Sequence, residues 1–155
     1  DSFPLLTTKK LHMRPIVHEL LWFLHGRTNV RSLNEHGVTS WDDWADDDGR
    51  LETAYGRFWR RFPVPDAGAH LDGEAWAGEG HPNVRREASG ALVFDQIGYV
   101  LDTLRRAPES RRLVVSAWHP ANAAVSRLPP CHYTFCFSVQ PASDGPDLLH
   151  CHLTQ

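Results

Sequence analysis

The 155 residues suit one domain with a moderate core, and their composition, 41% hydrophobic and 23% charged, is that of a globular protein. A formal net charge of −3 gives no indication of general nucleic-acid binding or membrane-surface binding. No apolar run approaches the roughly 20 residues that a membrane-spanning helix needs. Three cysteines cannot all pair, and their spacing matches no disulfide framework, so we expect a reducing, cytoplasmic location.

The first predicted helix spans residues 15–25. Pro15 suits the first helical position and Gly26 suits the position just past the end. Apolar side chains at helical spacing form one broad face: Ile16, Val17, Leu20, Leu21, Phe23 and Leu24. Glu19 lies at the edge of that face. Residues 28–37 predict a short helix that ends at Gly37, and an acidic loop with two tryptophans follows.

The second half of the chain predicts one helix and three strands. Residues 63–93, rich in proline, glycine and alanine, are typical of an inserted surface excursion. A helix is expected over 94–106, with Asp95 at its start and arginines at its end. Residues 112–118 read as a fully buried strand, 132–139 as an alternating strand and 147–155 as a third. The predicted class is α+β, with helices covering one face of a mixed sheet.

Cys131 is the first candidate for chemistry. Most free cysteines are small buried hydrophobes, and that alternative stays open for this one. Cys131, however, sits at the edge of its strand, after two prolines that keep the preceding backbone out of the sheet. His132 and nearby arginines are expected to supply positive charge, which lowers a thiol pKa. These features favour Cys131 as a nucleophile.

The other two cysteines carry a different expectation. Cys136 and Cys151 lie in mid-strand among apolar residues, where burial is the ordinary outcome. Runs such as Cys131-His132 and His150-Cys151-His152 look rich in metal ligands. Because neighbouring strand residues point to opposite faces, such runs cannot converge on one ion, so no metal site is expected.

Three further groups have both a structural and a functional interpretation. Glu19 either reaches solvent or an arginine, or is a carboxyl group adapted for proton transfer. Arg111 and Arg112 form either a surface basic pair or a phosphate clamp. Trp41 and Trp44 belong either to the core or to the wall of a cleft against which a planar ligand stacks.

Five segments together, in this order, resemble the thymidylate synthase family. The resemblance covers nearly the whole chain outside residues 63–93, where several bacterial members carry an insert. Its most specific motifs are HELLWFLHG, SRRLVVSAW and PPCH. The segments are FPLLTTKKLHMRPIVHELLWFLHGRTNV, TSWDDWADDDG, AYGRFWR, FDQIGYVLDTLRRAPESRRLVVSAWHP and LPPCHYTFCFSV.

The resemblance implies a methyltransferase that makes dTMP from dUMP. The one-carbon unit and the hydride would come from 5,10-methylenetetrahydrofolate, which leaves as dihydrofolate. A thiolate adds to C6 of the pyrimidine, which turns C4–C5 into an enolate able to attack the one-carbon unit. The resemblance also implies a homodimer formed through one face of the sheet.

The resemblance assigns roles to residues of this chain. Cys131 matches the nucleophile, Glu19 the glutamate that organises proton transfer, and Tyr55 a tyrosine of the same proton network. Arg111 and Arg112 match a pair that reaches the partner subunit's dUMP phosphate. The remaining matches are Gln155 in a phosphate-binding segment, and His12, Trp41 and Trp44 on the folate side.

The residues 1–155 are therefore interpreted as one partial catalytic domain. The chain opens without methionine and stops in what reads as mid-strand, so we expect it to be part of a longer chain. Two other functions stay open. One is a pyrimidine nucleotide hydroxymethylase of the same superfamily, acting on dCMP or CMP, and the other is a catalytically incomplete structural fragment.

Overall fold

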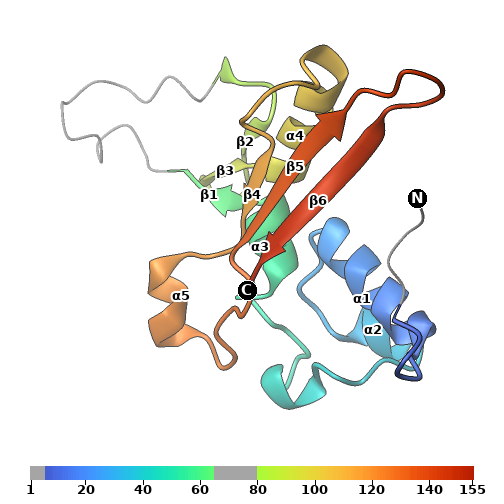
Figure 1. The fold of residues 1–155 in the computed structure, drawn as a ribbon. Helices are drawn as coiled ribbons and strands as arrows, with labels where there is room; N and C mark the ends of the chain where they lie inside the picture. The colour runs from blue at the N-terminus through green and yellow to red at the C-terminus, as the bar shows by residue number, and fades with distance from the viewer. Residues whose placement is uncertain (1–5, 65–79) are drawn as a thin grey trace.

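The structure of the chain is a computed structural model that describes residues 6–64 and 80–155 (Figure 1). Its helices are α1 (Met13–Leu24), α2 (Arg31–Asn34), the short 3-10 helix η1 (Asp42–Trp44), α3 (Tyr55–Arg60), α4 (Gln96–Arg106) and α5 (Pro120–Val125). Its strands are β1 (Phe62–Pro63), β2 (Val84–Arg86), β3 (Leu92–Phe94), β4 (Val114–Ser116), β5 (Thr134–Gln140) and β6 (Leu148–Thr154).

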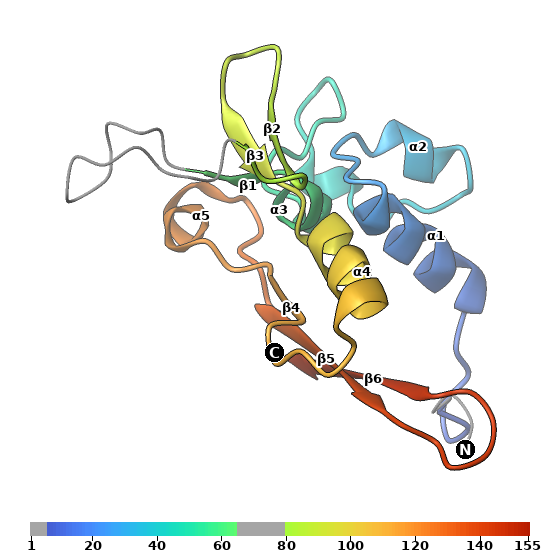
Figure 2. The ribbon, with the colours of Figure 1, turned by 90° about the horizontal axis from the view of Figure 1, so that it is seen from above.

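The described strands form two three-stranded antiparallel sheets, ordered β1-β3-β2 and β4-β5-β6. The second sheet carries the predicted nucleophile just before β5. Helices α1, α3 and α4 lie on one side of this sheet (Figure 2), and α3 and α4 contact β4. The predicted α+β class, with helices on one face, is confirmed.

The predicted first helix is confirmed, with small changes at its ends. Helix α1 starts at Met13, so Pro15 lies within its first turn, where a missing N–H costs no hydrogen bond. Gly26, at φ +68°, ends it in the left-handed region that glycine tolerates. Only Trp22 and Phe23 of this helix are buried. The apolar residues on the preceding turns, Ile16, Val17, Leu20 and Leu21, are exposed in the described structure.

Helix α3 crosses α1 at very short range because Gly56 has no side chain. A Cβ built at Gly56 would lie 2.9 Å from the carbonyl oxygen of Phe23 and 3.1 Å from that of Arg27. The neighbouring residues Tyr55, Phe58 and Trp59 are all buried. Trp59 packs its ring edge-on against Phe135 of β5, with centroids 4.8 Å apart. The short backbone approach at Gly56 therefore sets the position of Tyr55, one of the predicted site residues.

Helix α4 is fixed by two polar residues at its start. Asp95 caps it, since the Gly98 N–H donates to the Asp95 carboxylate at 2.9 Å, and Asp95 also accepts two hydrogen bonds from Arg60 at 2.8 Å each. Buried Gln96 donates to the carbonyl oxygens of Phe58 and Ser116, and accepts from the Ser116 N–H. Gln96 thus ties α4, α3 and β4 together, with all its hydrogen bonds satisfied in the interior.

The three predicted strands are confirmed, but their burial is not as expected. We call the side of the sheet that carries Val115 and Phe135 the inner face, and the side that carries Val114 and Cys136 the outer face. Val115 is fully buried, whereas Val114 is 38% exposed, so residues 112–118 are not buried on both faces. The described part of the chain leaves the outer face open, which is why the prediction was wrong.

The expected burial of Cys136 and Cys151 is also wrong, because both are exposed. Cys136 lies on the open outer face, paired with His152 of β6. Cys151 pairs with Phe137 and so belongs to the inner face. The inner-face neighbours of Cys151 on β6, Leu149 and Leu153, are exposed as well. An apolar mid-strand pattern predicts the face of a residue but not whether another element covers that face.

The predicted insert at residues 63–93 lies partly outside the described residues, since 65–79 are not described. On either side of that gap, β1 and β2 both pair with β3, with Phe62 opposite Phe94 and Val84 opposite Phe94. The flanks of the segment therefore join in one small sheet. The division of the chain into a catalytic domain and an inserted excursion stays a prediction.

Candidate active site

Cys131 ends the loop that runs from α5 to β5, and its position is fixed by Tyr55. The backbone N–H of Cys131 donates to the Tyr55 hydroxyl oxygen at 2.6 Å, across 76 residues of sequence. Pro130 before it is buried, while the cysteine itself is exposed. The two prolines supply no N–H to the sheet, so the chain enters β5 only after the cysteine. The thiol is thus presented at the strand edge, as predicted.

Tyr55 is buried at 7% exposure, which decides its protonation state. Burial raises the pKa of its phenol above the ordinary value of 10 and outweighs the hydrogen bond from the Cys131 backbone N–H, which acts in the opposite direction. The phenol is therefore neutral at physiological pH. Its oxygen accepts from the Cys131 backbone, and its proton can be donated toward the thiol or a bound ligand. The structure brings these two predicted site residues together.

His132 does not supply the positive charge expected next to Cys131. Burial lowers the pKa of its imidazole below the ordinary value of 6.5, so the ring is neutral at pH 7. The ring packs against the Tyr55 ring in a tilted arrangement, with centroids 3.9 Å apart and planes at 39°. Its Nε2 atom is buried and has no hydrogen-bond partner among the described residues. The expectation of a cationic His132 was wrong because sequence adjacency does not show burial.

The lowered pKa of His132 predicts a pH dependence of stability. The native ring resists protonation more than the unfolded one, so its contribution is complete above the unfolded pKa of about 6.5 and is lost as the pH falls toward the native pKa. We expect the free energy of unfolding, measured with urea at about pH 8 and about pH 5.5, to fall less in His132→Gln than in the parent protein. Equal falls in the two proteins would contradict this assignment.

Glu19 is half-buried, and its side-chain partner in the described structure is a tryptophan rather than an arginine. The indole Nε1–H of Trp41 donates to Glu19 Oε1 at 2.5 Å, which joins α1 to the residue that precedes η1. Trp41 also makes ring contacts with Phe23 and Tyr55, at centroid distances of 5.8 and 6.2 Å. Glu19, Trp41, Tyr55 and Cys131 therefore form a continuous row of contacts. Trp41 packs against the core and also orients a carboxylate, and its predicted role as the wall of a cleft stays a prediction.

An open pocket of about 510 Å³ lies beside the nucleophile. Its wall is formed by Cys131 together with the ends of β4 and β5: Ser116, Trp118, Tyr133 and Thr134. Gln155 lies next to it, since the Tyr133 N–H donates to the carbonyl oxygen of the preceding Thr154 at 3.1 Å. The sequence interpretation missed Ser116 and Thr134. They sit opposite each other in the register of β4 and β5, which strand alternation could have indicated.

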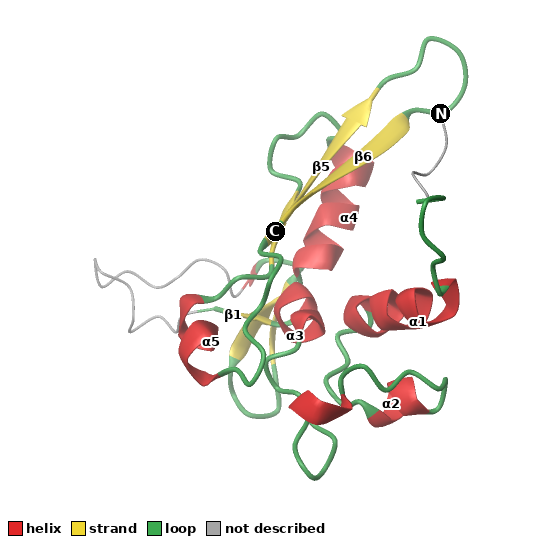
Figure 3. Ribbon diagram, turned by 60° about the horizontal axis from the view of Figure 1, so that its bottom comes forward, coloured by secondary structure: helices red, strands yellow, loops and turns green. Residues whose placement is uncertain are grey.

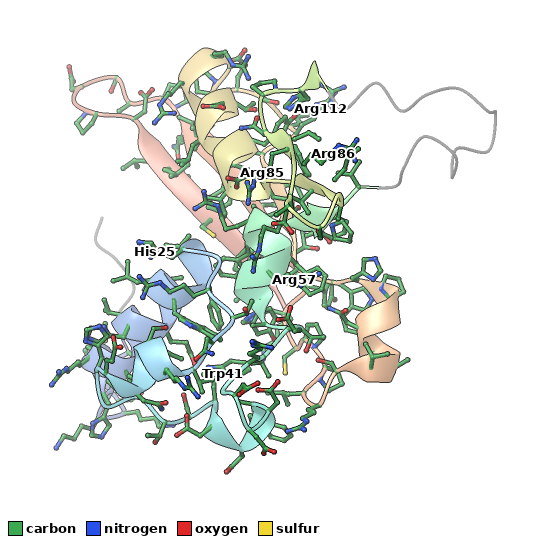
Figure 4. The ribbon with its side chains drawn as sticks, turned by 180° about the vertical axis from the view of Figure 1, so that it is seen from behind. His25, Trp41, Arg57, Arg85, Arg86 and Arg112 are labelled. Carbon is green, nitrogen blue, oxygen red and sulfur yellow. The ribbon has the colours of Figure 1, made fainter. Side chains whose placement is uncertain are left out.

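Arg111 and Arg112 are not at the site within one chain. They precede β4, whose register places Ser116 near the Cys131 end of the sheet and the arginines toward the other end. Both are exposed. Figure 4 shows Arg112 well apart from Trp41. The role that the resemblance implies for this pair, at the phosphate of a partner subunit's substrate, stays a prediction.

The other two residues predicted on the folate side, His12 and Trp44, lie in different parts of the structure. His12 is the exposed residue at the N-terminal cap of α1, the helix that carries Glu19. Trp44 does not line the pocket beside Cys131. It faces a separate cavity of about 130 Å³ whose wall includes Arg50, Thr53 and Arg127. The assignment of His12, Trp41 and Trp44 to a folate side stays a prediction.

Across residues 6–64 and 80–155, no group of three or more His, Cys, Asp or Glu side chains could hold a metal ion. No helix of those ranges has the length and apolar character needed to cross a bilayer.

Fold and site together define an α+β domain that presents one cysteine beside a pocket, backed by a row of a tyrosine, a tryptophan and a glutamate. The family model described as thymidylate synthase matches residues 1–155. A curated thymidylate synthase from Haloferax volcanii is 55% identical over 159 residues, which cover all of this chain and 43% of the relative. The chain belongs to the thymidylate synthase family, and it spans less than half the length of this relative.

Proposed function

We propose that the protein containing this chain is a thymidylate synthase, which converts dUMP to dTMP with 5,10-methylenetetrahydrofolate. Family membership and a 55% identical thymidylate synthase support the reaction. The single observation that carries the proposal is the placement of Cys131. Its exposed thiol borders a pocket of about 510 Å³, and its backbone is held by the hydroxyl group of Tyr55.

In the proposed mechanism, the Cys131 thiolate attacks C6 of the dUMP pyrimidine. The new S–C6 bond moves the C5–C6 electron pair toward C4 and its oxygen, so that C5 becomes nucleophilic. Tyr55 holds the Cys131 backbone and keeps its own phenol proton at neutral pH, available for donation. Glu19, held by the Trp41 indole, is placed to organise proton transfer at the same site. At the end the S–C6 bond breaks, the C5–C6 double bond re-forms and the thiolate leaves.

The residues on the folate side fit a planar, polar co-substrate in part. When bound, 5,10-methylenetetrahydrofolate supplies the one-carbon unit and the hydride. Trp41 offers an aromatic face with a carboxylate, Glu19, bonded to its indole edge. This pairing of a flat apolar surface with a hydrogen-bond acceptor suits a heteroaromatic ring that bears N–H groups. We propose Trp41 and His12 as folate-side residues, and assign Trp44 only an indirect role through its loop.

We also propose that the protein is a homodimer formed through the outer face of the β4-β5-β6 sheet. That face is open and includes Val114, at 38% exposure, and Cys136. The two arginines of one subunit would complete the partner subunit's pocket, because Arg111 and Arg112 precede β4, whereas Ser116 at the other end of that strand lines the pocket beside Cys131. Most of the other strand residues on that face are polar, among them Thr134, Ser138 and His152, and two copies of such a face can pair about a two-fold axis.

The dimer proposal predicts complementation between two inactive proteins. Cys131→Ser and the double variant Arg111→Ala/Arg112→Ala should each be inactive alone. Random mixing gives half mixed dimers with one intact site each, so we expect about a quarter of the parent activity after subunit exchange. Light scattering should report a dimer. A monomer, or no recovery after demonstrated subunit exchange, would contradict the cross-subunit role.

The substrate base is the second point to test, since a pyrimidine nucleotide hydroxymethylase uses the same thiol addition. We propose dUMP because the similar curated protein is a thymidylate synthase. Release of tritium from C5-labelled dUMP, with little release from labelled dCMP, is the expected result. Release from dCMP alone would favour the hydroxymethylase. Failure to bind or turn over either nucleotide would favour a structural role.

A cytoplasmic location completes the proposal. The three cysteines are free, and a thiolate nucleophile requires a reducing compartment to stay active. The partners that follow from the proposed reaction and dimer are dUMP, the folate and a second copy of the protein.

A further inference from the structure

Two segments far apart in the sequence are held together next to the candidate active site. One is the segment of residues 45–55, between η1 and the start of α3. The other is the loop of residues 126–131, which leads to the nucleophile. In Figure 3 they are the loop that leads into α3 and the loop that leads from α5 to β5. We call the second segment the cysteine loop.

Three hydrogen bonds join the cysteine loop to the first segment. Arg127 donates from Nη1 to the carbonyl oxygen of Ala45 at 2.6 Å, over a sequence separation of 82 residues. The hydroxyl groups of Thr53 and Ser126 are 2.6 Å apart. The third is the bond of the Cys131 N–H to the Tyr55 hydroxyl, also 2.6 Å. The bonds occur at both ends of the loop, near its start and at the cysteine.

The middle of the cysteine loop is stiff and poor in donors. Pro129 and Pro130 have fixed φ angles and no backbone N–H. Ser126 additionally donates to the carbonyl oxygen of Leu128 at 2.9 Å, which shapes the turn before the prolines. Because the diproline segment bends little, a displacement at residues 126–127 is transmitted to Cys131 rather than absorbed in between.

The first segment leads directly to the row of contacts around Cys131. Tyr55 is its last residue, and Trp41, which holds Glu19, comes shortly before it in the chain. The two segments border a common cavity of about 130 Å³, which Trp44, Thr53 and Arg127 line together. A hydrogen bond between the two segments therefore helps to fix the distance from Cys131 to Tyr55 and Glu19.

From this geometry we infer that Arg127 and the Thr53–Ser126 hydroxyl pair are positioning residues, which hold Cys131 in register with Tyr55 and Glu19. The chemical consequence rests on the proposed thymidylate synthase function, whereas the tether itself does not. Neither Arg127 nor Ser126 is assigned to contact substrate. Their effect is on the placement of the thiol, and misplacement of about 1 Å can slow an enzymatic step by about a hundredfold.

The inference is tested in the intact protein with a small set of variants. Arg127→Ala removes one tether, and Arg127→Lys keeps a donor of the same charge. Thr53→Val, Ser126→Ala and their double variant test the hydroxyl pair. The matched control is Arg50→Ala, because Arg50 is an exposed arginine on the same cavity whose ion pair, to Asp48 at 4.0 Å, stays within its own loop.

Amide hydrogen exchange at Cys131 is the first measurement, and it does not depend on the reaction. Loss of a tether should free the Cys131 N–H from Tyr55 more often, so exchange is expected to be about tenfold faster in Arg127→Ala and in the double hydroxyl variant. Arg127→Lys should stay within about twofold of the parent, as should Arg50→Ala. Unchanged exchange in Arg127→Ala, or an equal change in Arg50→Ala, would overturn the inference.

The second experiment measures two quantities. They are the rate of covalent adduct formation with 5-fluoro-dUMP and the folate, and the dissociation constant of dUMP. A positioning role predicts a rate about tenfold lower in Arg127→Ala with dUMP affinity and melting temperature nearly unchanged. A loss of affinity or melting temperature that accounts for the whole fall in rate would overturn it. If the parent forms no adduct, the proposed function fails, and hydrogen exchange still decides whether the tether positions Cys131.

Discussion

Replacing Cys131 with serine is expected to lower dTMP formation by roughly three orders of magnitude or more. A thiolate is a strong nucleophile, and a serine hydroxyl is almost fully protonated at pH 7 and attacks a pyrimidine C6 far more slowly. The substitution removes the attacking atom while keeping the backbone bond to Tyr55. The measurement is tritium release from C5-labelled dUMP by the intact protein.

Cys151→Ser is the matched control for this experiment. Cys151 is exposed like Cys131, but burial of part of its side chain raises the pKa of the thiol, which makes it a poorer nucleophile. We expect the control to keep most of the parent activity. Activity lost in Cys151→Ser and retained in Cys131→Ser would show that the wrong cysteine has been assigned.

Gly56→Ala is expected to destabilise the fold by about 2 kcal/mol. The added Cβ would come within 2.9 Å of the Phe23 carbonyl oxygen and 3.1 Å of the Phe23 Cα. Both are backbone atoms, so α1 and α3 must move apart to admit it. Alanine favours a helix over glycine by roughly 0.5–1 kcal/mol, which offsets only part of this cost. Urea unfolding of the two proteins gives the difference.

Gly80→Ala is the control for the glycine experiment. A Cβ at Gly80 would meet no atom within 4 Å, so the free energy of unfolding should change little. Because α3 begins with Tyr55, Gly56→Ala should also loosen the Tyr55–Cys131 hydrogen bond and lower activity. A Gly56→Ala protein as stable as the parent would contradict the close helix crossing.

Local sequence signals predicted most elements of the fold. The apolar spacing and Gly26 located α1, and Asp95 located the start of α4 within two residues. The alternating pattern predicted that Phe135 and Phe137 lie on the opposite face of β5 from Cys136, and the structure packs both phenylalanines against the core. These signals are properties of a few neighbouring residues, so they can be read without knowing what packs against them.

Contacts between residues that are far apart in the sequence could not be predicted from such local signals. The partner of Glu19 is an indole 22 residues away, and the neutrality of His132 results from burial beside Tyr55. The exposure of Cys136 and Cys151 depends on whether another element covers the sheet. The roles of Cys131, Glu19 and Tyr55 were predicted from resemblance. The structure adds their contacts: Tyr55 bonds directly to the Cys131 backbone, and Glu19 is linked to Tyr55 through the ring of Trp41.

The central claim is that Cys131 forms a covalent bond to C6 of the pyrimidine. It is tested most directly by incubating the intact protein with 5-fluoro-dUMP and 5,10-methylenetetrahydrofolate, followed by digestion and mass spectrometry. The expected result is one modified peptide, with nucleotide and folate both attached at Cys131. An unmodified protein, or modification at Cys136 or Cys151 instead, would contradict the claim.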